Sequence, residues 1–67
     1  MRTLLRNKES RRYFETPHAW TGRWNRAFDF EYSERALQVA QELGLEGIEL
    51  IGKSEEGDTL FVSNVKT

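Results

Sequence analysis

The residues best suited to chemistry in this chain are arginines interleaved with aromatic rings near the N-terminus. Residues 1–26 carry seven cations and two carboxylates, a net charge of +5, whereas residues 27–67 carry three cations and nine carboxylates, a net charge of −6. Guanidinium groups neutralise phosphates or pair with carboxylates, and exposed rings stack on bases or fill pockets of a partner. The candidate partner-binding residues are the arginines and tryptophans of the basic half: Arg11, Arg12, Trp20, Arg23, Trp24 and Arg26.

Two functions fit this basic-aromatic segment. The first is a non-catalytic protein-interaction module, which binds a protein partner or a second copy of itself, or inhibits a larger assembly; Trp, Tyr and Arg are the residues most enriched among interface hot spots. The second is single-stranded nucleic-acid binding, in which the rings stack on bases and the arginines contact phosphates. A purely structural role is also open, with Trp20 and Trp24 packed on the core and Arg23 and Arg26 lying across their rings. Exposed tryptophan rings would favour one of the two binding functions, and buried rings would favour the structural role.

The composition gives little support for catalysis or for metal binding. The chain has no cysteine and a single histidine, His18, so disulfides, thiol catalysis and cysteine-based zinc sites are excluded. His18 follows a proline and is interpreted as an exposed loop residue. The carboxylates around Gly57 lack the ligand spacing of an EF-hand loop and are interpreted as a solvated turn. We therefore predict that the protein is not an enzyme, with no catalytic residue, metal, cofactor or small-molecule substrate.

The length of 67 residues allows one domain with a thin core. Residues 1–10 are polar and basic without sustained periodicity, which predicts a flexible basic arm, and residues 11–67 form the single domain. The chain shows no apolar stretch long enough for a signal peptide or a membrane span. A small secreted domain usually needs disulfides. The sequence therefore predicts a cytoplasmic protein with no membrane partner.

The hydrophobic pattern predicts an α+β fold, in which one amphipathic helix packs on one face of a small, largely antiparallel sheet. The helix spans about 34–43: Ser33 is a suitable N-cap, and Gly44 is suited to the left-handed residue that ends it. The elements follow a β-β-α-β-β order, with strands at 11–16, 26–30, 47–53 and 59–65 and a loop at 18–25. The last two strands form a hairpin across the turn that contains Gly57.

The predicted core takes one apolar face from each of these elements. In the helix, Ala36, Leu37, Ala40 and Leu43 follow helical spacing and form the inward stripe. The strands add alternating apolar positions. The full expected core is Phe28, Phe30, Leu37, Ala40, Leu43, Leu45, Ile48, Leu50, Leu60 and Val62.

Part of the chain resembles a group of small bacterial α+β proteins. The resemblance covers about residues 13–52 and rests on Trp20-Thr21, the run Ala27-Phe28-Asp29-Phe30, an alanine-containing helix and the strand that follows it. The C-terminal hairpin departs from the acidic-aromatic ending usual in that group. The resemblance implies a compact α+β module; no activity is assigned to the group, so it implies no site residues.

Overall fold

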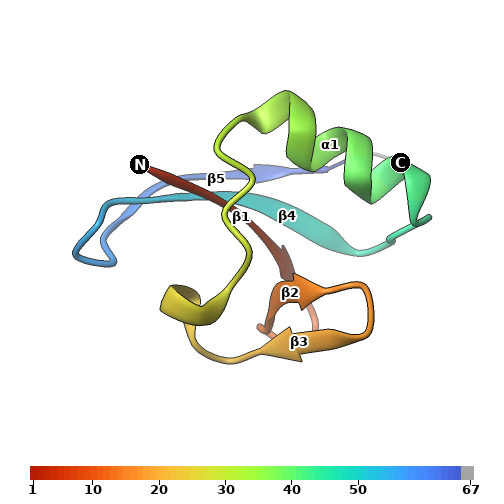
Figure 1. Cartoon of the computed structure of the whole chain (residues 1–67), viewed down its shortest axis with the longest axis horizontal. Helices are drawn as coiled ribbons and strands as arrows, with labels where there is room; N and C mark the ends of the chain where they lie inside the picture. Colours follow the sequence, from red (N-terminus) through yellow and green to blue (C-terminus); the bar gives the residue numbers. More distant parts are fainter. Residues whose placement is uncertain (66–67) are drawn as a thin grey trace.

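A five-stranded antiparallel sheet carries one helix across one of its faces (Figure 1). The computed structural model describes residues 1–65, so the last two residues of the predicted 11–67 domain lie outside the described part. The elements are β1 (Arg2–Asn7), β2 (Tyr13–Thr16), β3 (Ala19–Thr21), the one-turn 3-10 helix η1 (Trp24–Arg26), α1 (Ser33–Glu42), β4 (Ile48–Lys53) and β5 (Thr59–Asn64). The strand order is β3-β2-β1-β4-β5, and every pairing is antiparallel. The predicted α+β class is confirmed.

The N-terminal segment is the central strand of the sheet, so the prediction of a flexible basic arm over residues 1–10 is wrong. All six residues of β1 pair with β4, from Arg2 opposite Lys53 to Asn7 opposite Ile48. Leu4 and Leu5 are completely buried and point to opposite faces because successive strand residues alternate. A central strand covered on both faces shows adjacent apolar residues instead of alternation. The pair Leu4-Leu5 was that signal.

The segment between β2 and α1 also differs from the prediction. The expected loop at 18–25 contains β3 and η1, and the expected strand at 26–30 is irregular backbone. This irregular segment nevertheless bonds to two strands: the Phe28 amide donates to the Phe14 carbonyl at 3.0 Å, and the Phe30 amide donates to the Thr3 carbonyl at 2.9 Å. The irregular segment therefore connects β1 to β2 by backbone hydrogen bonds. The direct pairing of these two strands is at Arg6 and Tyr13.

Helix α1 lies within one residue of its predicted bounds, and Gly44 takes the expected left-handed conformation, with φ of +63°. Ser33 is the first helical residue and Tyr32 holds the cap position, so the predicted Ser33 cap is wrong. The helix buries Ala36 and Ala40 against the sheet. Both buried residues of the helix are small, so α1 itself fills little of the core volume.

The core has two parts because both faces of β1 and β4 are covered. The face under α1 contains Leu5, Phe14, Phe30, Ala36, Ala40, Ile48 and Leu50. The opposite face contains Leu4, Tyr13, Ala27 and Ile51. Burial of Phe30, Ala40, Ile48 and Leu50 confirms those predictions, and Leu45 is partly buried against the first group. The prediction is wrong for the five exposed side chains Phe28, Leu37, Leu43, Leu60 and Val62.

The hairpin of β4 and β5 is confirmed, and its register explains the exposed residues of β5. Val62 pairs with Ile51 and Phe61 pairs with Gly52, with an irregularity between Gly52 and Lys53. The Phe61 ring occupies the space that a side chain at Gly52 would need. Phe61 therefore packs towards the helix-side core, whereas Val62 lies on the opposite face at the edge of the sheet.

Candidate functional site

The two tryptophans of the predicted binding segment lie on opposite faces of the sheet. Trp20 packs against the cluster that contains Leu5 and the helix alanines. Trp24 packs against the cluster that contains Leu4. Since Leu4 and Leu5 are consecutive strand residues, these clusters are separated by the sheet itself. The two rings cannot form one continuous surface for stacking or docking.

Each tryptophan is half-buried and has a packing partner. The Trp20 ring meets Phe14 edge-on, with 5.6 Å between centroids and an interplanar angle of 88°. The Trp24 ring lies so close to Gly57 that an added Cβ there would be 2.6 Å from the indole. The cation over Trp24 is Arg2, with its guanidinium carbon 5.5 Å from the ring centroid. Both rings thus pack on the core, as in the purely structural alternative. The arginine that lies over Trp24 is Arg2, however, and not Arg23 or Arg26.

The four predicted arginines are exposed and lie in two separate groups. Arg11 and Arg12 are in the turn after β1, where the Asn7 amide donates to the Arg12 carbonyl. Arg23 precedes η1 and Arg26 is its last residue. This short helix lies near the start of β1, since Arg2 Nη1 donates to the Asn25 carbonyl at 3.5 Å. The length of β1 separates the two groups. The structure therefore does not assemble the six predicted site residues into one surface.

One of these arginines adds to an ion pair on the face opposite α1. Arg6 Nη2 lies 3.0 Å from Glu49 Oε2, and Arg11 Nη1 lies 3.8 Å from the same oxygen. Burial alone would lower the pKa of Arg6, but hydrogen bonds and electrostatic attraction from Glu49 and Tyr13 outweigh it, and the pKa is raised. Glu49 is almost fully buried, so this pair holds β1 to β4 more than it marks a binding site.

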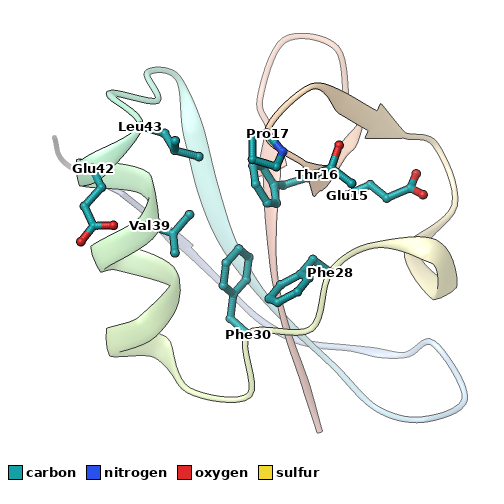
Figure 2. Close-up of a pocket in the computed structure, with 9 residues that line it drawn as sticks. Glu15, Thr16, Pro17, Phe28, Phe30, Val39, Glu42 and Leu43 are labelled. Atoms are coloured by element: carbon teal, nitrogen blue, oxygen red, sulfur yellow. The ribbon is translucent and has the colours of Figure 1, made fainter.

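A more concentrated site lies between α1 and β2. A pocket of about 360 Å³ opens there (Figure 2), large enough for one or two side chains of a partner. It is lined by Phe14, Glu15, Thr16, Pro17, Phe28, Phe30, Val39, Glu42 and Leu43. Val39 and Leu43 project from the helix towards Pro17 and Phe30 on the other side. The pocket is thus bounded by the helix on one side and by β2 and the Phe28–Phe30 segment on the other.

The lining is apolar at its centre and acidic at its two sides. Phe28 is 49% exposed although its ring meets the buried Phe30 ring edge-to-face, with 4.8 Å between centroids. Leu43, at the end of α1, is 44% exposed. The carboxylates of Glu15 and Glu42 stand at opposite sides of the pocket and point away from its apolar centre (Figure 2).

Sequence reasoning missed this pocket because it assigned Phe28 and Leu43 to the core. The sequence signal that could have revealed the pocket is the difference in size between the small alanines of the helix stripe and the large apolar side chains near them. Phe28 and Leu43 are large apolar side chains next to a helix whose buried residues are Ala36 and Ala40, and both remain exposed.

Other chemistry is sparse in the described part of the chain. Within residues 1–65, the structure contains no group of three His, Asp or Glu side chains placed to hold a metal ion. His18 is exposed in the β2–β3 turn, as predicted, and its amide donates to Thr16 Oγ1. Over the same residues, α1 is too short and too polar to cross a membrane, and so is η1.

Comparison with protein-family models, curated proteins and solved structures finds no match for this chain. The resemblance to small bacterial α+β proteins therefore stays a prediction from the sequence, and the site is assigned from its geometry.

Proposed function

We propose that this protein is a non-catalytic protein-interaction module that binds apolar side chains of a partner protein in the pocket between α1 and β2. The observation that carries the proposal is the exposure of Phe28 and Leu43 on two sides of one apolar pocket. Together with the neighbouring rings they offer a partner a preformed hydrophobic contact.

The energetic basis is the covering of apolar surface. Removing apolar area from water stabilises a complex by roughly 25 cal/mol per Å² before the costs of association. In protein interfaces most of the binding energy comes from a few well-packed residues at the centre, surrounded by a polar rim. Phe28 and Leu43 correspond to such a centre, and Glu15 and Glu42 to the rim.

The rim also specifies the chemistry of the partner. The two charged side chains that line the pocket are the carboxylates of Glu15 and Glu42, and they stand on opposite sides of it. A partner segment with an apolar centre and a basic residue on each side complements this pattern, because opposite charges at an interface favour the correct encounter and orientation. The proposed partner is therefore a basic-apolar-basic segment of another protein.

The proposed binding site lies outside the basic-aromatic segment that the sequence predicted. Single-stranded nucleic-acid binding, the other function predicted from the sequence, needs rings that stack on successive bases. Trp20 and Trp24 are half-buried on opposite faces, so they do not favour that function. The proposed location is the cytoplasm, where a cysteine-free domain of this size is typical.

The test uses short defined peptides and amide and methyl chemical shifts of the whole protein. The probe is a capped tetrapeptide of sequence Arg-Leu-Phe-Arg; the two controls replace its apolar pair by alanines or its arginines by glutamates. We expect the probe to shift signals of Phe28, Val39 and Leu43, and each control peptide to bind at least about tenfold more weakly.

The variant Phe28→Ala should lose this binding while keeping the dispersed spectrum of the folded protein. Peptide-induced chemical-shift changes that instead cluster at Trp24, Arg23 and Arg26 would show that the binding site is in the basic-aromatic segment. Equal binding of all three peptides would contradict the proposed chemistry of the pocket.

A further inference from the structure

Strand β5 is an open edge that pairs regularly with β4 from Phe61 to Asn64, beyond an irregularity near its start. Within residues 1–65 it pairs with β4 on one side, and it is the last strand in the sheet order. Its six residues, Thr59–Asn64, include no charged residue and no proline in a chain that is 31% charged. Leu60 and Val62 are 55% and 51% exposed. An uncharged edge of this length is a template for pairing with another strand.

The opposite edge of the sheet is a shorter strand with proline and charge next to it. Strand β3 has three residues, and it is preceded by Pro17 and His18 and followed closely by Arg23. Short length, proline and charge are the means by which proteins block pairing at an edge. The contrast between the two edges indicates that β5 is the one left available.

We propose that two copies of this chain pair along β5, in antiparallel orientation, to form one continuous sheet about a two-fold axis. Such an interface is self-complementary, since each residue contact occurs twice. Residues near the axis face their own counterparts, where like charges would repel. The uncharged sequence of β5 avoids this repulsion along its whole length.

The acidic turn before β5 favours the antiparallel orientation. The turn that precedes β5 carries Glu55, Glu56 and Asp58. Antiparallel pairing places the acidic turns of the two copies at opposite ends of the interface. Parallel pairing would place two acidic turns together.

The apolar side chains of β5 add to the backbone pairing. Val62 lies opposite the buried Ile51, on the face away from α1. In the proposed dimer the exposed Val62 of each copy lies near that of the other and extends this apolar face. The surface is separate from the α1–β2 pocket, so the dimer and the proposed function can fail independently.

The experiment is sedimentation equilibrium of the full chain from about 1 μM to about 1 mM, the range that covers weak to moderate self-association. We expect the mean mass to rise from 7.9 kDa towards twice that value and to stop there. The variant Val62→Lys places like charges across the axis, and should weaken the dimer at least about tenfold. Leu60→Lys is a second variant with the same expected effect.

The control is His18→Lys, which adds the same charge at an exposed residue of the β2–β3 turn, beside the opposite edge of the sheet. It should dimerise as the unaltered protein does, and circular dichroism should show that all variants are folded. A mass of 7.9 kDa at every concentration overturns the proposal. A dimer insensitive to both β5 lysines, or a mass that grows without limit, also overturns it.

Discussion

Asp29 ties the irregular segment before α1 to the central strand: its Oδ1 accepts a hydrogen bond from the Thr3 amide at 3.0 Å. The same oxygen accepts from the Glu31 amide at 2.9 Å. Glu31 has a φ of +67°, a conformation that non-glycine residues rarely adopt. One carboxylate thus satisfies a strand amide and fixes the bend that carries the chain from Phe28 and Phe30 into α1.

Replacing Asp29 with alanine should therefore destabilise the fold as well as displace Phe28. It leaves a part-buried strand amide without its acceptor, at a cost of about 1–3 kcal/mol. Asp29→Asn is the control, because its amide oxygen can accept both bonds. Urea unfolding measures the difference, and equal stability of the alanine and asparagine variants would contradict the assigned role.

Gly52 is required by the ring of Phe61. A Cβ at Gly52 would overlap that ring, so Gly52→Ala should lower the free energy of unfolding by about 1–3 kcal/mol. In the background of Phe61→Ala the same change should cost much less, because the overlap is gone. A double-mutant cycle with no coupling between the two positions would show that the ring does not occupy this space.

The Arg6–Glu49 pair should matter far more than the exposed pair Arg2–Glu55. Glu49→Gln leaves a largely buried guanidinium with no carboxylate partner at 3.0 Å and should cost about 3 kcal/mol. Glu55→Gln should cost less than about 1 kcal/mol, because that carboxylate is solvent-exposed.

The pH dependence of this pair follows from the raised pKa of Arg6. A group whose pKa is raised on folding contributes its full stability below its unfolded pKa, and loses it only as the pH rises through the folded value. The Glu49→Gln effect should thus be the same at neutral and at mildly alkaline pH. A marked decrease over that range would contradict a permanently charged Arg6.

Much of the fold could be predicted from the sequence because local signals agreed with the tertiary structure. Periodicity and Gly44 located α1, and β-branched residues on both sides of a glycine turn located the β4–β5 hairpin. The strand β1 could not be recognised by alternation, because Leu4 and Leu5 serve two different cores. Its burial depends on partners more than 40 residues away in the chain, beginning with Lys53 opposite Arg2.

The candidate site was less predictable for a physical reason. Composition shows which side chains are suited to binding, but not which face of the sheet each one occupies. Trp20 and Trp24 are close in sequence, yet the chain crosses from one face to the other between them. Phe28 and Phe30 alternate as in a half-buried strand, but their segment is irregular backbone in which Phe30 is buried and Phe28 is exposed beside the pocket.

Fluorescence can report on the pocket without a label. Trp20 contacts Phe14, which lines the pocket, whereas Trp24 lies on the opposite face of the sheet. In the variant Trp24→Phe, the Arg-Leu-Phe-Arg peptide should change the emission of the remaining tryptophan. In Trp20→Phe the emission should stay constant, and the reverse pattern would place the peptide on the other face.

The comparison of Leu43 with Leu37 tests the central claim most directly. Both are exposed leucines near or within α1, at 44% and 41%, but Leu43 lines the pocket and Leu37 does not. Leu43→Ala should weaken binding of the Arg-Leu-Phe-Arg peptide by about tenfold or more in a calorimetric titration, and Leu37→Ala should leave it unchanged. Equal affinities of the two variants would contradict the assignment of the pocket as the binding site.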